Sequence, residues 1–548
     1  MGNEYDQILT YHTETKHSLQ RYARSAGFMD WENQPSSFRF YQNAPRIELP
    51  LGTADPQGKH LDLFVRNNNQ PLPFSRHIIG KFLELSLGLS AWKQSGGSKW
   101  VLRMNPSSGN LHPTESHLIL PETNDLKRGI YHYNAFGHYL AERCILPEQA
   151  EKIWTTHYGT EGFFIALSSI FWRESWKYGE RAFRYCHLDV GHALAALSFA
   201  ANLLGWKISY LPSISDDDLE KLIGFDRTKW RSAEQDEVDC LCYVHSNQKE
   251  ILPGSFPEKL LTLLSTLQIQ GIPEPLSQEH IDWQIIEQVA SATRKGTTDY
   301  EDIHLLSPPC YQFPDVTFSG AALIRRRRSG VDFDRGKSTM GLEKFLAMLA
   351  ATLPCVKQAP FDIALSSPHI NLLLFVHRVE GMAPGLYLLV RNQRDYKKLK
   401  DKFHSSFLWE KSCDELPLFL LMKKDMQFTA KEMSCGQDIA GDSTFSLAML
   451  SFFDDIIASE PYRYKQLFWE AGIIGQVLYL QAEAYGFRGT GVGCFLDDSV
   501  HQLVGLQDLS FQSLYHFTVG YPLIDKRLQT LPAYHHLPDK FKEYGACS

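Results

Sequence analysis

The sequence predicts an α+β fold that is present twice in the chain. Residues 186–225 align without a gap on residues 467–506, at a constant offset of 281 positions (467 minus 186). Gly191 falls on Gly472, although few other positions are identical. In addition, predicted helices and mainly antiparallel strands follow one another in the same order in both halves. We therefore expect two copies of one domain.

The composition is that of a globular protein too long for a single hydrophobic core. Hydrophobic residues make up 43% and charged residues 22% of the 548 residues, and no apolar run is long enough to span a membrane. The formal net charge of −8 argues against nucleic acid as a ligand. The ten cysteines contain no Cys-x-x-Cys motif, and the N-terminus has no signal-peptide pattern. We expect a cytoplasmic protein with reduced thiols and without nucleic-acid or membrane partners.

Four segments can be distinguished along the chain. Residues 1–75 are polar, rich in aromatic residues and interrupted by prolines, which indicates an extended N-terminal arm. Residues 76–248 and 321–548 form the two predicted domains. Residues 249–320 contain two helical patterns among Pro, Gly and polar residues, and we expect them to link the domains.

The first domain is predicted to contain a helix, three strands, a long helix, a short helix and a last strand. Gly191 and Gly205 bracket the long helix, 192–204, whose alanines allow close packing. Ser215 and Asp218 form a capping box that opens the short helix. The other predicted elements are the helix 78–89 and the strands 117–120, 130–133, 163–170 and 241–244.

The second domain repeats this order. Residues 473–485 form its long helix, and residues 418–422 take the place of the third strand. The remaining elements are the helix 342–352 and the strands 372–376, 386–390 and 515–519. Two such domains can pack as an internal pseudo-dimer, with the long helix of each buried against the other.

A polar loop precedes the first predicted strand of the first domain. Arg103, Pro106, Ser107, Ser108 and Asn110 combine hydroxyl, amide and backbone hydrogen-bonding groups in one turn. A flat heteroaromatic ring with carbonyl and imide edges requires such a mixture. The alternative is an ordinary helix-to-strand loop with an Asx turn.

The second domain carries two further clusters. Residues 325–329 hold four arginines and a serine, which suit a phosphate because guanidinium groups bind it through paired, charged hydrogen bonds. The alternative is a solvated basic patch. Gly489, Gly491 and Gly493 allow a backbone to approach a planar ligand closely. Their G-x-G-x-G spacing is not a dinucleotide fingerprint, and a glycine-rich helix exit is the alternative.

Lys177 and Tyr178 stand next to each other in a run rich in arginine. Such a pair can supply a proton acceptor and a proton donor. The alternative is the start of a surface helix with mixed charges.

Together, the order and spacing of these motifs resemble the FMN-dependent nitroreductase superfamily, in particular a tandem two-domain form of its SagB-type azoline dehydrogenase branch. The resemblance covers residues 11 to about 536, and its motifs are specific in combination. The stretches that match are 11–18, 30–35, 105–115, 177–185 with Asp189, Gly191 and His192, 326–329, 489–498 and 515–520.

This resemblance implies a flavin site assembled from both copies. Members of the superfamily are usually homodimers that bind FMN at the subunit interface. By that pattern the second copy would hold the phosphate and line the flavin, through Arg326, Arg327, Ser329, Gly489, Gly491, Gly493 and Arg527. The first copy would contribute Arg103, Pro106, Ser107, Ser108 and Asn110.

The reciprocal site is expected to be lost. The first copy has residues 208–212, which include no glycine, where the glycines would be needed. The second copy has residues 361–368 where the polar loop would sit. We therefore expect one FMN per chain, in a monomer that acts as an internal pseudo-dimer or in a higher oligomer.

The resemblance also implies a reaction. Lys177 and Tyr178 match a pair implicated in abstracting a proton from a thiazoline or oxazoline ring of a small or modified-peptide substrate. A hydride would pass to flavin N5, and dioxygen would reoxidise the flavin. Two alternatives stay open: a reductase of nitro or quinone compounds that uses NAD(P)H, and a non-catalytic scaffold for a flavin, a peptide or partner enzymes. We expect no metal site, since the histidines lack partners at ligand spacing.

Overall fold

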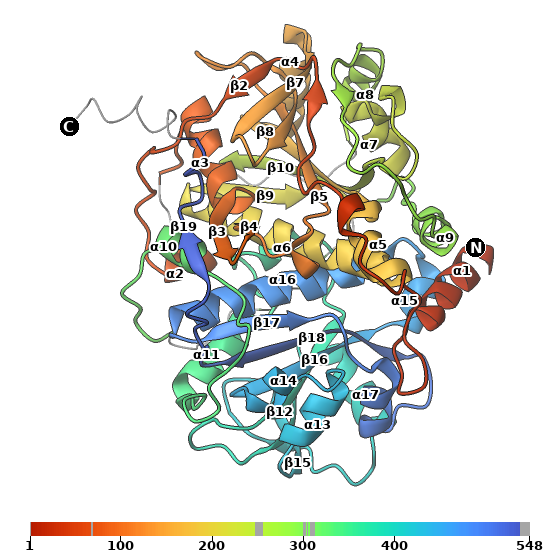
Figure 1. Ribbon diagram of the computed structural model, residues 1–548, viewed down its shortest axis with the longest axis vertical. Helices are drawn as coiled ribbons and strands as arrows, with labels where there is room; N and C mark the ends of the chain where they lie inside the picture. The colour runs from red at the N-terminus through yellow and green to blue at the C-terminus, as the bar shows by residue number, and fades with distance from the viewer. Residues whose placement is uncertain are drawn as a thin grey trace.

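The computed structural model describes residues 2–66, 70–246, 256–299, 303, 305–306 and 313–537. Two seven-stranded sheets lie on opposite sides of a central pair of long helices, α6 (Ala182–Leu203) and α16 (Arg463–Ala484) (Figure 1). The predicted α+β class with mainly antiparallel sheets is therefore confirmed. No helix in these described segments combines the length and the apolar character needed to cross a bilayer.

The two sheets have equivalent strand orders, and every neighbouring pair in them is antiparallel. The first sheet runs in the order β2 (Arg46–Glu48), β7 (Tyr139–Ile145), β6 (Gly129–Asn134), β5 (Thr114–Leu120), β8 (Gly162–Ser169), β10 (Glu237–Ser246) and β9 (Trp206–Tyr210). The second runs in the order β14 (Glu410–Lys411), β15 (Leu418–Lys423), β13 (Gly385–Leu389), β12 (Ile370–Val376), β16 (Phe445–Phe452), β18 (Phe511–Gly520) and β17 (Arg488–Val492).

The strand order corrects one prediction about the second domain. Residues 418–422, predicted as its third strand, belong to β15, which occupies the place of β7. The counterpart of β8 is instead β16, and neither β7 nor β16 is among the predicted strands. All residues of β16 except the last are buried, so it lacks the alternation that marks a strand with one solvent-exposed face.

The long helices α6 and α16 touch each other backbone to backbone where Gly191 meets Gly472. A Cβ atom on Gly191 would lie 2.1 Å from the Trp469 carbonyl oxygen, and one on Gly472 would lie 2.2 Å from that of Leu188. Only glycine permits this approach. Both helices run through these glycines, whereas the sequence predicted that each would begin after its glycine.

Two buried ion pairs cross between the halves with approximate twofold symmetry. Arg184 Nη1 lies 2.8 Å from Asp497 Oδ1, and Lys465 Nζ lies 2.7 Å from Asp216 Oδ2. Each pair joins the start of one long helix to the start of a short helix of the other half, α17 (Asp497–Val504) or α7 (Asp216–Ile223). Because the partners correspond at the same offset of 281, the halves form the internal pseudo-dimer that the repeat predicts.

The N-terminal segment is not a purely extended arm. It begins with α1 (Gly2–Glu14), which packs on the second half through hydrogen bonds from Tyr5 to Asp454 (2.5 Å) and between His12 and Tyr464 (3.1 Å). The same segment supplies β2 to the first sheet. Its prolines all lie after residue 34, so the preceding residues are free to form a helix.

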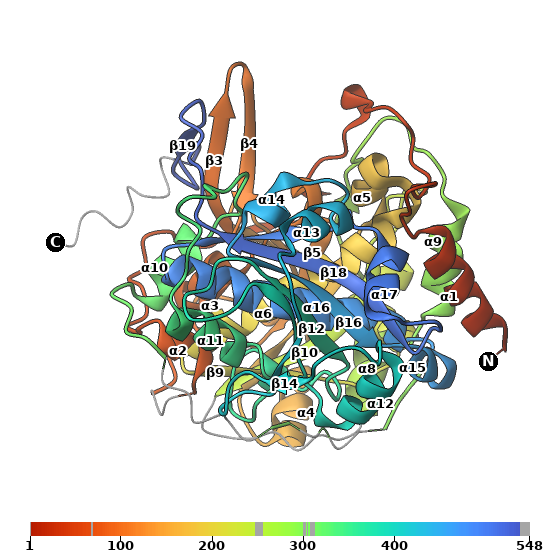
Figure 2. The same cartoon turned by 90° about the horizontal axis from the view of Figure 1, so that it is seen from below.

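A hairpin of β3 (Leu89–Ser95) and β4 (Ser98–Arg103) projects from the body of the protein (Figure 2). It pairs with β19 (Gln529–Leu531), so the C-terminal part of the chain returns to the first half. The sequence prediction placed the polar loop directly after a helix and missed this hairpin, although Gly96 and Gly97 form its turn. Because β4 ends at Arg103, it fixes where the polar loop begins.

The predicted linker contains α8 (Glu258–Ser265) and α9 (Gln284–Ala292). The predicted boundary between residues 248 and 249 lies outside the described residues, and the boundary between 320 and 321 falls at the start of α10 (Gly320–Arg326). The domain limits therefore stay predictions.

The helix crossing can be tested with Gly472→Ala, which we expect to lower the free energy of unfolding by at least about 2 kcal/mol. The added methyl group would push the Leu188 carbonyl away and separate the helices. Gly80→Ala is the matched control, because Gly80 is also a buried helix glycine, in α3 (Arg76–Ser86), but a Cβ there would make only an ordinary contact, 3.4 Å from Leu49 Cβ. The free energy of unfolding of this variant should change by no more than about 1 kcal/mol. Urea unfolding followed by circular dichroism measures both. Equal losses of unfolding free energy in the two variants would contradict the requirement for glycine at the helix crossing.

Candidate functional site

Two adjoining cavities lie where the halves meet. The first has a volume of about 310 Å³ and is lined by Gly491 and Gly493, so we call it the glycine cavity. The second has a volume of about 440 Å³ and is lined by several arginines, so we call it the arginine cavity. Pro106, Ser107 and Ser329 line both cavities, which therefore form one continuous site.

The polar loop of the first half is held rigidly at the junction of the cavities. Asn110 Nδ2 donates to the Val101 carbonyl at 2.8 Å, and the His112 N–H donates to Ser107 Oγ at 2.8 Å. Gly109 has φ +60°, and a Cβ there would lie 2.6 Å from the Tyr178 hydroxyl, so the loop requires glycine at this point. Pro106, Ser107 and Ser108 line the glycine cavity. Arg103 and Asn110 line the arginine cavity.

Gly489 and Gly491 of β17, and Gly493 directly after it, are required by packing against aromatic rings of the protein. A Cβ would lie 1.7 Å from the Tyr515 hydroxyl at Gly491, and 2.4 Å from the Tyr185 ring at Gly493. At Gly489 it would lie 2.6 Å from the Phe517 ring, and Gly489 lines neither cavity. Gly489 therefore packs against the protein's own rings, whereas Gly491 and Gly493 pack in this way and also line the glycine cavity.

Tyr479 of α16 connects β17 to the arginine-rich residues 325–329. Its hydroxyl accepts the Gly491 N–H at 3.0 Å and shares a hydrogen bond with Ser329 Oγ at 3.0 Å. Two of the predicted site residues, from separate segments of the second half, are therefore brought together at the glycine cavity.

The arginine cavity concentrates positive charge that the protein leaves largely unpaired. Arg327 is buried, and its Nη2 donates to the Arg103 carbonyl at 2.9 Å. Its Nε and the Nε of Arg103 have no hydrogen-bond partner among the described residues. Burial lowers the pKa of Arg327, and it lowers the pKa of Arg103 and of Arg328 to about 10. The cationic residues of the lining are Lys93, Arg103, Arg327, Arg328 and Arg488.

This charge distribution favours a bound anion with several oxygen atoms. Asp525, the acidic residue of the described lining, is already bound to Arg527 at 2.8 Å. A phosphate group would relieve the repulsion between the guanidinium groups and accept their free N–H donors.

Arg326 and Arg527, also predicted for the phosphate, line neither the glycine cavity nor the arginine cavity. Arg326 ends α10 with its side chain 54% exposed and bound to Glu483 at 3.2 Å. Arg527 is 85% exposed and bound to Asp525. Successive residues at the end of a helix point in different directions, and the sequence does not show which arginine turns inward. The cations it missed are Lys93, Arg328 and Arg488, of which Arg328 lies in the same run.

Lys177 and Tyr178 end α5 (Phe171–Tyr178) and meet at the polar loop. A Cβ built on Gly109 would lie 2.6 Å from Tyr178 Oη and 3.2 Å from Lys177 Nζ. Tyr178 lines the glycine cavity, and burial raises its pKa, so its phenol stays a proton donor. The predicted pair is therefore half-buried beside the cavity and is not the exposed helix start of the alternative interpretation.

Two buried acids beside this pair were not predicted as site residues. Asp189 of α6 lines the glycine cavity and accepts hydrogen bonds from the Ser108 N–H (3.0 Å) and Oγ (3.2 Å). Burial raises the pKa of Asp189 to about 7, against the effect of the Ser107 and Ser108 hydrogen bonds. It can therefore exchange a proton near neutral pH. Asp189 belongs to one of the matching stretches, but no pattern in the sequence indicates its role.

Glu174 of α5 is the second buried acid. Neither of its carboxylate oxygens has a hydrogen-bond partner among the described residues. Burial raises the pKa of Glu174, the nearby charge of Asp189 adds to this effect, and Lys177 opposes it. No sequence signal distinguishes this glutamate from a surface residue.

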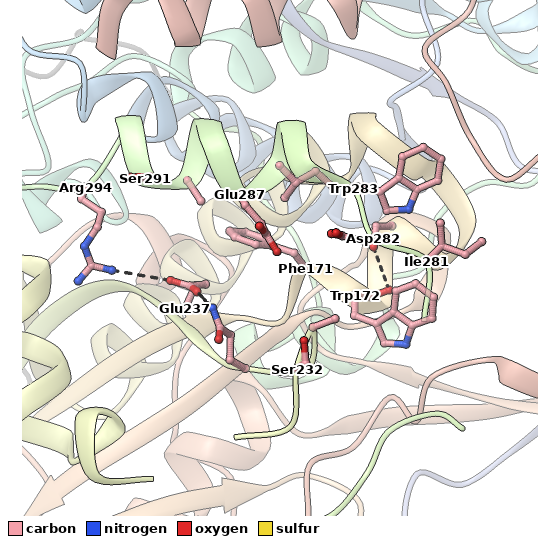
Figure 3. Close-up of a pocket in the computed structure, with 15 residues that line it drawn as sticks. Phe171, Trp172, Ser232, Glu237, Ile281, Asp282, Trp283, Glu287, Ser291 and Arg294 are labelled. Carbon is pink, nitrogen blue, oxygen red and sulfur yellow. Dashed lines mark hydrogen bonds and ion pairs between the residues drawn. The ribbon is translucent and has the colours of Figure 1, made fainter. Parts of the chain in front are cut away.

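A separate cavity of about 390 Å³ is lined by Phe171, Trp172 and Ser175 of α5 together with residues of α9 and the preceding loop (Figure 3). Trp172, Ile281 and Trp283 gather at one end of it, and Glu237 faces Arg294 at the other. It contains none of the predicted site residues.

The position equivalent to the polar loop in the second half is filled. A 3₁₀ turn, Phe361–Ile363, stands there beside a cavity of only about 30 Å³. Glu470, which corresponds to Asp189 at the offset of 281, lines this space and forms a 2.5 Å ion pair with Arg391. A space of this size holds only one or two water molecules.

Comparison with known proteins supports the same reading of the fold. Residues 327–521 match the model of the Nitroreductase family. A solved structure from Anabaena variabilis ATCC 29413, described as a nitroreductase, is 20% identical, with a TM-score of 0.68 over 94% of this chain and 99% of that chain. No curated protein matches the sequence.

Shorter structures match one half of the chain. One, from Ralstonia eutropha JMP134 and also described as a nitroreductase, is 15% identical, with a TM-score of 0.27 over 42% of this chain and 100% of that chain. Another belongs to the E. coli microcin synthetase McbBCD complex with truncated pro-MccB17 bound. It is 18% identical, with a TM-score of 0.26 over 45% of this chain and 94% of that chain. The chain therefore has a nitroreductase-like fold along most of its length, and its second half carries the nitroreductase family match.

Proposed function

We propose that this protein is an FMN-dependent oxidoreductase with one flavin bound across its two halves. The observation that carries the proposal is the arginine cavity, which adjoins the glycine cavity and whose Arg103, Arg327 and Arg328 bind backbone carbonyls but form no ion pair among the described residues. A phosphomonoester joined to a flat, polar ring matches this combination of a cationic end and a narrow, hydrogen-bonding end.

The donor sets at the two ends fit FMN. Arg327, Arg328 and Ser329 of the second half would hold its phosphate. Pro106 and Ser107 of the first half would face the ring from one side, and the edge of β17 at Gly491 and Gly493 would face it from the other. Each half supplies only part of the site, so neither half is expected to bind FMN alone.

Within this function, we propose SagB-type dehydrogenation of an azoline ring in a small or modified-peptide substrate. FMN would supply the redox chemistry by accepting a hydride. Lys177 Nζ lies beside the polar loop and would remove the ring proton, and the Tyr178 hydroxyl would donate a hydrogen bond there. Asp189 holds the Ser108 N–H and orients the loop. The resemblance at Lys177 and Tyr178 supports this finer assignment.

The phosphate end can be tested with Arg327→Met, which we expect to weaken FMN binding by about 10- to 100-fold, the loss of one or two charged hydrogen bonds. Arg326→Met is the matched control, because Arg326 is adjacent in sequence but points to Glu483, and its affinity should change less than about twofold. Quenching of flavin fluorescence on titration measures both. A larger loss in Arg326→Met would refute the assigned site.

The catalytic proposal can be tested with Lys177→Ala, which should retain FMN and lower the rate of azoline oxidation by about 10²- to 10⁴-fold. The control is Lys152→Ala, because Lys152 is exposed on α4 (Glu148–Tyr158). Flavin absorbance and substrate oxidation are followed together. Activity that survives in Lys177→Ala would rule out the role of Lys177.

Rapid anaerobic bleaching of the flavin by NADPH would favour a reductase, and failure to bind FMN at all would favour a scaffold.

A further inference from the structure

Two cysteines from distant parts of the second half meet at the rim of the glycine cavity. Cys494 directly follows Gly493 and lines the cavity. Cys435 lies between α13 (Gln427–Met433) and α14 (Asp438–Asp442) in a left-handed conformation, with φ +55°. Both side chains are half-buried and free. The loop that carries Cys435 also places Gln437 in the cavity wall.

Hydrogen bonds on both sides of the cysteines hold these two segments together. The Leu496 N–H donates to the Met433 carbonyl at 2.9 Å. Gln437 Nε2 donates to the Cys494 carbonyl at 3.2 Å. These two bonds bring the segments side by side, and the Cys435 and Cys494 thiols lie close enough to interact.

The surroundings of the pair distinguish its two members. His17 and the guanidinium of Arg181 lie near Cys494, whereas Cys435 is next to the Tyr22 hydroxyl. The neighbouring Cys435 thiol, together with His17, lowers the pKa of Cys494, and the same contact raises the pKa of Cys435. The thiolate therefore resides on Cys494, the cysteine that faces the cavity, and a thiol stands ready beside it.

The other described cysteines do not share this arrangement. Cys240 and Cys242 are also close to each other, but both are buried in β10 and out of reach of a reagent. Cys413 is half-buried near the surface, without a second cysteine among its interactions, and burial raises its pKa. It therefore serves as an internal control for an ordinary thiol.

We propose that Cys435 and Cys494 form a reversible dithiol–disulfide couple, with small disulfides and thiols as its reaction partners. In oxidation, the Cys494 thiolate attacks one sulfur of an external disulfide, the S–S bond breaks, and one thiolate leaves. Cys435 then loses its proton and attacks the Cys494 sulfur, which releases the second thiol. The protein dithiol loses two electrons and two protons, and the external disulfide becomes two thiols.

The disulfide would covalently join two segments that line the glycine cavity. In the dithiol state, the loop with Gln437 is joined to the end of β17 by the two hydrogen bonds named above. A covalent link between Cys435 and Cys494 would fix that loop in place. This couple depends on the position of the cysteines and not on FMN chemistry, so it can be tested on the flavin-free protein.

The test is to incubate the reduced protein with oxidised glutathione, stop the reaction by acid and alkylation, and map the peptides by mass spectrometry. We expect a linked Cys435–Cys494 peptide that has lost two hydrogens, and the same product in the control Cys413→Ser. In Cys435→Ser the resolving thiol is missing, so Cys494 should keep one glutathione. None of these experiments needs a substitution at Cys494.

A second readout is the rate of alkylation by iodoacetamide at neutral pH, where Cys494 should react at least about tenfold faster than Cys413. The proposal is overturned if Cys494 reacts no faster than Cys413, or if the wild type and Cys435→Ser give the same mixed disulfide. Both assays are done on the flavin-free protein, so their outcome does not depend on whether FMN binds, which separates this proposal from the proposed function.

Discussion

The backbone contact between α6 and α16 at Gly191 and Gly472 is the constraint on which the rest of the structure depends. A methyl group at either position would collide with a carbonyl of the opposing helix. The ion pairs Arg184–Asp497 and Lys465–Asp216 set how the halves are rotated about this contact. Asp189 lies two residues before the crossing point on α6, and β17 follows directly after α16. The close crossing therefore brings the polar loop of one half opposite the glycine strand of the other.

The two halves have the same fold, but the residues at equivalent positions differ in charge and polarity. Asp189 is a buried carboxyl without a cationic partner among its hydrogen bonds, and its pKa is raised, whereas its counterpart Glu470 is neutralised by Arg391. Polar, hydrogen-bonded residues surround the first position, and Phe361 fills the space beside the second. A duplicated fold can keep its packing in both copies and still lose one of two sites, because packing and ligand binding depend on different residues. This asymmetry supports a single flavin site.

The sequence predicted the packing of the fold better than the direction of its side chains. The α+β class and the paired long helices follow from patterns that depend on local spacing and on the offset of 281. The buried strand β16 escapes prediction because an apolar run without alternation has no strand signature. Arg326 and Arg327 are adjacent and chemically identical, yet only Arg327 turns into the cavity. Glu174 carries no motif, and its unusual pKa arises only from burial beside Asp189. Such properties depend on tertiary contacts.

The number of flavins bound per chain tests the central claim most directly. The protein is saturated with FMN, freed of excess ligand by gel filtration and denatured, and the released flavin is measured by its absorbance against the protein concentration. One asymmetric site shared by the two halves predicts a ratio near one. A ratio near two would show that the space beside Phe361 also takes a flavin, and would contradict the account.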